Sequence, residues 1–298
     1  MRQTFRTLRP TLSSFQTPSH TLYLPTLLYK TKVDMSRICL LITILLLLPS
    51  CIEYHPYDMR ISGETGVNAR NIQRIEEGCR GRNAIRFAVI GDTQRWYDET
   101  QEAVEAINRR NDIDFVIHTG DMANFGMRKE FELQRDILNG LACPYVCLLG
   151  NHDCLGNGYL IFQEIFGSYD FAFTAGNTRI VCLNMNALDF DHTMTIPNFQ
   201  FLDNELAHFP AEAQKSVLVM HADPLSDIAD RGVAQIFRRY TEHFSSLQFC
   251  VNGHGHNYKE SDLFDNGTIY YQCDAIEKRY LLIFTLNDEG YTHERIPF

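Results

Sequence analysis

Short apolar runs and helix-spaced segments alternate along residues 84–149. The apolar runs are residues 85–90, 115–117 and 145–149, and the segments 99–110 and 129–138 between them repeat apolar residues at the helical spacing. The order strand, helix, strand, helix, strand predicts a layer of βαβ units with a parallel sheet. Ligands of such a sheet gather beyond the carboxyl ends of its strands, so the residues after each run are the first candidates for a site.

The pattern changes in the second half of the chain. Residues 171–174 and 179–184 predict an antiparallel hairpin, residues 198–208 and 229–244 have helical periodicity, and residues 217–220 and 249–251 predict buried strands that each end at a histidine-containing loop. Four further strands, 258–263, 268–271, 280–286 and 291–296, predict a closing meander. No internal repeat is present. One α/β (α+β) domain over residues 84–298, with two β-sheets flanked by helices, is the simplest architecture.

The N-terminal part of the chain has the pattern of an export signal. The apolar run of residues 38–48 is well short of the roughly 20 residues that a membrane-spanning helix needs. A short basic segment precedes it, and Leu48-Pro49-Ser50-Cys51 resembles a lipobox, so residues 35–51 predict a lipoprotein-type signal peptide with a lipidated Cys51 in the membrane. Residues 1–34 are then an unstructured upstream extension and residues 52–83 a polar tether. The alternative is a hydrophobic anchor with an unprocessed N-terminus.

Composition and charge narrow the classes of partner. Hydrophobic residues make up 45% and charged residues 21% of the 298 residues, which excludes a disordered, collagen-like or multi-span membrane protein. Residues 52–298 carry 21 Lys and Arg against 36 Asp and Glu, a net charge of −15. Long duplex nucleic acid is therefore an unsuitable partner. The nine cysteines include no CxxC pair, which argues against a zinc knuckle and favours small buried hydrophobes.

Five predicted strand ends finish in polar residues that can bind metals. In chain order these are Asp92 and Gln94, Asp121 and Asn124, Asn151 with His152 and Asp153, His221, and His254 with His256. A single Gly-Asp turn or a single histidine is weak support for a site, because turns and buried histidines are common. The same position at the end of five elements, with carboxylate, amide and imidazole donors, indicates a site for Mn, Fe or Zn.

In this order the motifs resemble those of the calcineurin-like metallophosphoesterase superfamily, D-x-H, GDxx(D/N), GNH(D/E), H and GHxH. The resemblance covers residues 84–260 and implies the fold of that superfamily, two packed mixed β-sheets flanked by α-helices. It also implies two divalent metal ions. The first is held by Asp92, Gln94, Asp121 and His256, and the second by Asp121, Asn151, His221 and His254, with Asp121 bridging.

Gln94 departs from the pattern, since most members of the superfamily have histidine there. A glutamine carbonyl oxygen is a neutral and harder donor than an imidazole nitrogen, so it should bind a soft divalent ion less tightly while still permitting coordination. The departure therefore bears on the identity and the affinity of the first metal more than on activity.

The ligand set also makes chemical sense. Two cations held about 3.5–4 Å apart lower the pKa of a bridging water and offset the charge of a phosphate, so hydroxide can attack phosphorus at neutral pH. His152 is a candidate to donate a proton to the leaving alkoxide or to stabilise charge on the transferring phosphoryl group, with Asp153 as its candidate orienting partner. Asn124 can steady its loop or contact a substrate oxygen. Arg95 and Trp96 can hold a phosphate and stack on a base or sugar, or form an ordinary surface pair.

The main hypothesis is a phosphomonoesterase or phosphodiesterase of a bacterial cell envelope, lipid-anchored and facing the periplasm or the exterior. Its substrate is a phosphorylated small molecule or a nucleotide, attacked directly by hydroxide. Two alternatives stay open. One is a non-catalytic binding module on the same fold, whose weakened first site senses phosphate or docks a partner. The other is a nuclease for short oligonucleotides.

Overall fold

The computed structural model describes residues 34–47, 55, 58–190 and 194–298, which form two compact units divided after residue 53. The first unit contains one described helix, α1 (Met35–Leu47). Within the described part of the chain, no helix combines the length and the apolar character needed to cross a membrane. Cys51 and residues 1–33 lie outside the described residues, so the signal peptide, the lipid anchor and the upstream extension remain predictions.

The second unit begins with the predicted βαβαβ layer. Strands β1 (Ile85–Ile90), β2 (Phe115–His118) and β3 (Tyr145–Cys147) pair in parallel, joined by α3 (Tyr97–Asn108) and α4 (Arg128–Leu138). Strand β10 (Tyr280–Asn287) pairs antiparallel with β1 and β11 (Gly290–Pro297) pairs antiparallel with β10, which gives the order β11-β10-β1-β2-β3. Both faces of β1, β2 and β3 are covered, which explains why they appear in the sequence as continuous apolar runs.

The other sheet has the order β4-β5-β6-β7-β9-β8. Its members are β4 (Phe171–Ala175), β5 (Thr178–Leu183), β6 (Lys215–Met220), β7 (Leu247–Asn252), β8 (Lys259–Asp262) and β9 (Ile269–Gln272). Four central strands run in parallel, and β4 and β8 are antiparallel edges. The predicted closing meander is wrong, because β8 and β9 belong to this sheet while β10 and β11 belong to the first. Strand periodicity shows which faces are buried but not which sheet a hairpin joins.

The two sheets pack face to face over a core of aromatic rings. Five fully buried phenylalanines meet there, namely Phe87, Phe115, Phe173, Phe249 and Phe284. The ring centroids of Phe249 and Phe284 are 4.3 Å apart, and those of Phe87 and Phe115 are 5.1 Å apart. Burying each such side chain stabilises the fold by about 1.5–3 kcal/mol, so this layer holds the sheets at a fixed spacing.

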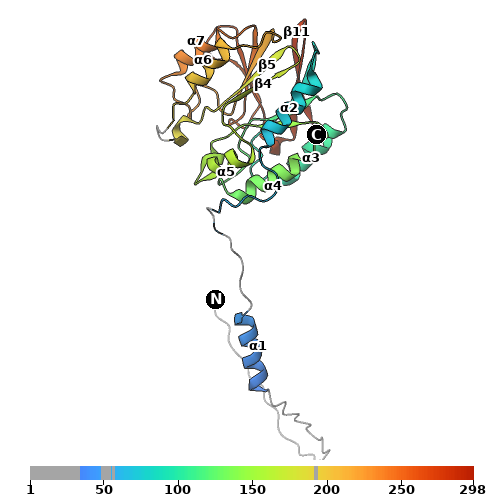
Figure 1. Cartoon of the computed structure of the whole chain (residues 1–298), viewed down its shortest axis with the longest axis vertical. Coiled ribbons are helices and arrows are strands. Elements are labelled where there is room, and N and C mark those ends of the chain that lie inside the picture. The colour runs from blue at the N-terminus through green and yellow to red at the C-terminus, as the bar shows by residue number, and fades with distance from the viewer. Residues whose placement is uncertain (1–33, 48–54, 56–57, 191–193) are drawn as a thin grey trace, which may run out of the picture. The chain divides into compact units, whose positions relative to one another are not determined.

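Helices cover the outer face of each sheet (Figure 1). Helices α3, α4 and α5 (Gly158–Ile165) pack on the first sheet, and α6 (Phe199–Ala207) and α7 (Ala234–Thr241) pack on the second. Helix α7 is shorter than the predicted segment 229–244, because residues 227–233 form a loop before it. The predicted fold class, two mixed sheets flanked by helices, is confirmed.

Part of the predicted tether belongs to the folded domain. Helix α2 (Val67–Cys79) occupies its middle, with Val67, Ile75 and Cys79 buried. The Asn68 amide pairs with the backbone of Cys147, donating to its carbonyl at 2.8 Å and accepting from its N–H at 2.9 Å, and so closes the edge of β3. The prediction of a tether over residues 52–83 is therefore wrong at this helix. Most residues of α2 are polar, so its apolar face is too narrow to be recognised from the sequence pattern.

Candidate metal centre

The carboxyl ends of β1, β2 and β7 bring the predicted ligands of the first metal together, and the end of β6 adds His221 of the second. Ligand atoms of Asp92, Asp121 and His221 all lie within 4.8 Å of one another, and all three side chains are buried. Nε2 of His256 lies 3.4 Å from Oδ1 of Asp92, and the Gln94 amide lies 3.3 Å from Oδ2 of Asp121. The four residues predicted for the first metal therefore form one group.

The second predicted group is centred on Asn151, which follows β3. Its Oδ1 lies 3.0 Å from Nε2 of His221 and 3.0 Å from Nδ1 of His254. Nε2 of His221 is also 3.5 Å from Oδ1 of Asp121, so Asp121 borders both groups. The structure thus brings together all seven side chains that the sequence predicted as metal ligands.

The hydrogen bonds around the two imidazoles point their lone pairs at these oxygens. Nδ1 of His221 lies 3.0 Å from the carbonyl oxygen of Thr119, which can only accept, so Nδ1 carries the hydrogen and Nε2 faces Asp121 and Asn151 with a lone pair. In the same way Nε2 of His254 donates to Asp227 at 2.9 Å and leaves Nδ1 facing Asn151. Ring nitrogens and oxygen atoms that converge in this way can bind a cation placed between them. The arrangement therefore fits metal ions, with Thr119 and Asp227 fixing the ligand rings.

Asp92 adds a second sign of a cation site. Its Oδ1 is buried and has no hydrogen-bond partner among the described residues. Burial raises the pKa of Asp92, but the contact with the His256 imidazole opposes that effect, and the pKa lies below its ordinary value. In turn, the Asp92 carboxylate raises the pKa of His256. An ionised, buried carboxylate oxygen without a donor is a suitable ligand for a divalent ion.

The backbone at the site is held in an unfavourable conformation. Five of the ligand residues have left-handed φ angles: Asp92 at 50°, Gln94 at 34°, Asp121 at 59°, His254 at 66° and His256 at 59°. Such a conformation costs on the order of 1–3 kcal/mol at each residue that is not glycine, and it persists where the surrounding structure enforces it. Its concentration at the strand ends is typical of a functional site.

The glycines of the motifs allow the strand-end loops to approach one another. A Cβ atom added to Gly150 would lie 2.2 Å from both the backbone nitrogen and Oδ1 of Asp121. At Gly120, which has φ of 107°, a Cβ would lie 2.8 Å from Nδ1 of His221. Since real atoms cannot approach that closely, glycine at these positions is what permits Asp121 to sit between the other ligands.

Asp153 does not orient His152, which corrects the sequence prediction. Its carboxylate is fully buried and accepts the backbone N–H groups of Asp121 at 3.0 Å, Ala123 at 2.7 Å and Gly150 at 2.9 Å. Burial and the Asp121 carboxylate raise the pKa of Asp153, while these three hydrogen bonds oppose the rise. Asp153 therefore ties the loop after β2 to the loop after β3.

His152 is oriented by the main chain instead. Its Nδ1 lies 3.0 Å from the carbonyl oxygen of Asn124, so Nδ1 donates and Nε2 is the ring nitrogen available for a substrate. The backbone N–H of His152 donates to Oδ1 of Asp121 at 2.9 Å. Asn124 thus steadies this loop through its carbonyl group, one of the two roles predicted for it, and a contact of Asn124 with substrate remains a prediction.

Replacing Asp153 with alanine should destabilise the protein by at least about 3 kcal/mol, because three buried N–H groups lose their acceptor at about 1–3 kcal/mol each. Urea unfolding of the metal-free protein measures the change. Asp262 is the matched control, since its carboxylate accepts the N–H groups of Asn266 and Gly267 in an exposed turn. Asp262→Ala should change stability little. An Asp153→Ala protein as stable as Asp262→Ala would show that this carboxylate is not a structural tie.

Two supporting residues were not among the residues predicted for the site. His118, at the end of β2, is fully buried, and burial lowers its pKa to about 3, so it is neutral. It accepts from the N–H of Gly120 at 3.1 Å and donates to Oγ1 of Thr93 at 2.9 Å. These two hydrogen bonds join the loop after β1 to the loop after β2. The other supporting residue is Asp227. It was missed because it lies in a polar loop far from any of the five motifs. His118 could have been found from the sequence, because it is a histidine at the end of an apolar run.

Arg95 and Trp96 form a stacked pair directly after the first ligand loop. The Arg95 guanidinium carbon lies 5.2 Å from the centroid of the Trp96 ring. Trp96 is partly buried and packs against the hydrophobic core of the first sheet, while Arg95 is exposed. The pair is a cation–π contact, and its predicted role in substrate binding stays a prediction.

Two mixed sheets with carboxylate, amide and imidazole ligands clustered at their strand ends define the class of metallophosphoesterases. The calcineurin-like phosphoesterase family model matches residues 85–258, more than half of the chain, and the chain belongs to that family. The resemblance carried by the five motifs is confirmed. Members of this family are typically dependent on two metal ions, and the buried Asp92, Asp121 and His221 can hold such an ion here.

The similarity of the chain to individual proteins agrees with this family assignment. A Rhodopseudomonas palustris protein named "Probable cyclic nucleotide phosphodiesterase" is 36% identical over 165 residues, 47% of this chain and 58% of that protein. A Nostoc protein named "3',5'-cyclic-nucleotide phosphodiesterase" is 28% identical over 118 residues, 39% of this chain and 44% of that protein. The chain thus matches only about half the length of these relatives. A dimetal phosphatase of Danio rerio shares the fold, with a TM-score of 0.58 at 13% identity over 72% of this chain and 99% of the other.

Proposed function

We propose that this chain is a metal-dependent phosphodiesterase that hydrolyses a nucleotide ester. The observation that carries the proposal is the convergence of His221 and His254 on Asn151, with His221 also facing Asp121, beside the buried carboxylate of Asp92. The full predicted ligand set is present, which favours an enzyme over a non-catalytic module. The names of the two relatives support a diester of a nucleotide as the substrate class.

Each group of the site has a task in this reaction. When bound, two divalent cations supply charge for the phosphate oxygens and activate a water for attack on phosphorus. Asp121 holds the two positions together, because it borders both donor groups. His152, protonated at Nε2 and fixed through Nδ1, gives its proton to the leaving oxygen. Asp153 keeps the loops that carry both residues in register.

The location of the enzyme is part of the proposal. Residues 35–51 have the sequence of a lipoprotein signal, and we infer that the phosphodiesterase domain is anchored through a lipid on Cys51 at a bacterial cell envelope. The strongly acidic domain agrees with a small substrate, since it would repel long nucleic acid. Labelling of the full chain with a radioactive fatty acid should depend on Cys51, and unlabelled protein would exclude the anchor.

The activity is tested with the protein reconstituted with Mn²⁺ and assayed on four substrates: bis(p-nitrophenyl) phosphate, p-nitrophenyl phosphate, cyclic nucleotides and short oligonucleotides. We expect hydrolysis of the diesters, loss of activity on treatment with EDTA, and recovery when Mn²⁺ is added. Elemental analysis should show two metal equivalents per chain. A protein that holds two equivalents and leaves all four substrates intact would support the binding module. Faster cleavage of oligonucleotides than of cyclic nucleotides would favour the nuclease.

A further inference from the structure

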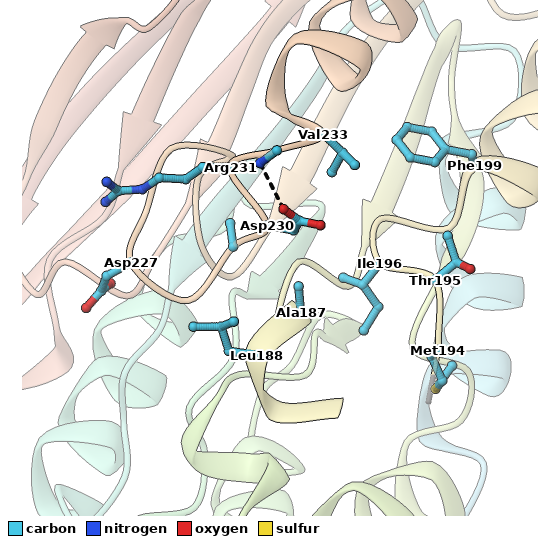
Figure 2. Close-up of a pocket in the computed structure, with 12 residues that line it drawn as sticks. Ala187, Leu188, Met194, Thr195, Ile196, Phe199, Asp227, Asp230, Arg231 and Val233 are labelled. Carbon is cyan, nitrogen blue, oxygen red and sulfur yellow. Dashed lines mark hydrogen bonds between the residues drawn. The ribbon is translucent and has the colours of Figure 1, made fainter. Parts of the chain in front are cut away.

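A pocket of about 760 Å³ adjoins the metal centre (Figure 2). Residues from two parts of the chain line it: residues 187, 188, 194–196 and 199 follow β5, and residues 227 and 229–233 follow β6. Asp227 belongs to both sites, because it lines the pocket and its Oδ1 accepts the hydrogen of Nε2 of His254 at 2.9 Å. A group bound in the pocket is therefore next to a predicted metal ligand, and the volume falls in the range of small-molecule sites.

The walls of the pocket differ in character. The apolar wall is formed by Leu188, Met194, Ile196, Phe199 and Val233. Leu188 and Met194 remain 63% and 42% exposed, so the pocket presents apolar surface to solvent. Flat apolar groups are well suited to such a wall, since binding there removes apolar area from water on both partners.

The polar side of the pocket is acidic. Asp230 accepts the N–H of Gly232 at 2.8 Å through Oδ1, which fixes its carboxylate and leaves Oδ2 for a ligand. In Figure 2 this carboxylate points toward Ile196, whereas the Arg231 guanidinium points to the opposite side. Nε of Arg231 donates to the carbonyl of Ser226 at 3.1 Å. Asp230 thus offers a ligand a carboxylate oxygen, which accepts and does not donate.

The negative charge of the pocket further restricts which ligands can bind there. Asp227 and Asp230 place two carboxylates at the pocket. A second phosphate group would meet repulsion here, because metal ions offset charge only at the ester that reacts. The substrate therefore carries one phosphate charge and a neutral organic group.

We propose that this pocket binds the base of the nucleotide ester and selects bases with an exocyclic amino group. The inference rests on the proposed function and names its substrate class. The planar base lies against the exposed part of the apolar wall, and its amino group donates to Asp230. Cytosine presents this amino group, whereas uracil presents a carbonyl oxygen at the same position, which faces the Asp230 carboxylate unfavourably.

Cyclic CMP and cyclic UMP are the matched substrates for the test. We expect kcat/KM of the Mn²⁺-reconstituted protein to be about tenfold higher for the cytidine ester, the value of one hydrogen bond to a charged group. Asp230→Asn should reduce the preference to about twofold or less, since an amide both donates and accepts. Asp265→Asn, in an exposed turn at a left-handed φ of 52° that asparagine tolerates, should keep the wild-type preference.

Two further measurements separate this inference from the proposed function. Methyl p-nitrophenyl phosphate has no base, so its hydrolysis should be equal in wild type and Asp230→Asn; no hydrolysis by either would count against the function alone. Saturation-transfer NMR of the metal-free protein with cytidine and with uridine reports the pocket without catalysis, and cytidine should give the stronger signal, lost in Asp230→Asn. Equal signals for the two nucleosides, an unchanged cytidine preference in Asp230→Asn, or a preference for choline esters over both nucleotides would overturn the inference.

Discussion

Replacing Asp121 with alanine should remove metal binding and lower turnover by at least about a thousandfold, equivalent to about 4 kcal/mol of transition-state stabilisation. Asp121 is the ligand that the two donor groups share, since Oδ2 faces Gln94 and Oδ1 lies 3.5 Å from His221. Without its charge, Asp92 is the remaining carboxylate among the predicted ligands, and two like-charged cations lose the group that holds them close together. Elemental analysis and titration with Mn²⁺ measure the loss directly.

Gln94→Ala is the graded control for this experiment. Gln94 borders only the group formed with Asp92 and His256, so its removal should lower the content of one metal and leave the other near one equivalent. Both variants should unfold at similar urea concentrations, which shows that lost metal is not lost structure. An Asp121→Ala protein that retains two equivalents would refute the shared role of Asp121.

The sequence predicted the ligands because their positions follow from topology. Strands β1, β2 and β3 are parallel neighbours, so the residues after them must meet at one edge of the sheet. Strands β6 and β7 end at the same edge of the facing sheet, which adds His221 and the loop with His254. Strand order and residue type therefore placed these residues at one edge, and the resemblance of the motifs to the family assigned them to two metals.

Other features depend on contacts that no local pattern encodes. Asp153 follows His152 in the sequence, and the pair suggested a catalytic couple, but the turn of η1 (His152–Cys154) directs the carboxylate inward to three backbone N–H groups. Asp227 meets His254 only because the loop before α7 returns to the site. Such positioning residues are set by tertiary structure and appear in the sequence as ordinary loop aspartates.

Replacing His152 with alanine should leave the metal content unchanged and slow the hydrolysis of a cyclic nucleotide by about 10²- to 10⁴-fold, the usual contribution of a general acid. The imidazole is bound through Nδ1 to the carbonyl of Asn124 and is not among the predicted ligands, so its loss leaves the metal-binding side chains intact. A ribose alkoxide needs a proton to leave, whereas nitrophenolate does not. Bis(p-nitrophenyl) phosphate should therefore be slowed much less than the cyclic nucleotide.

The dependence on the leaving group is what distinguishes proton donation from a structural role. His208 is a matched control, because its Nδ1 lies 3.1 Å from the carbonyl of Asn204, the same type of contact on an exposed helix end. His208→Ala should keep full activity on both substrates. If His152→Ala slowed both esters by the same factor, the side chain would act on the phosphoryl group or on the loop. Because Nε2 is the nitrogen left available by the Asn124 contact, the structure favours unequal losses.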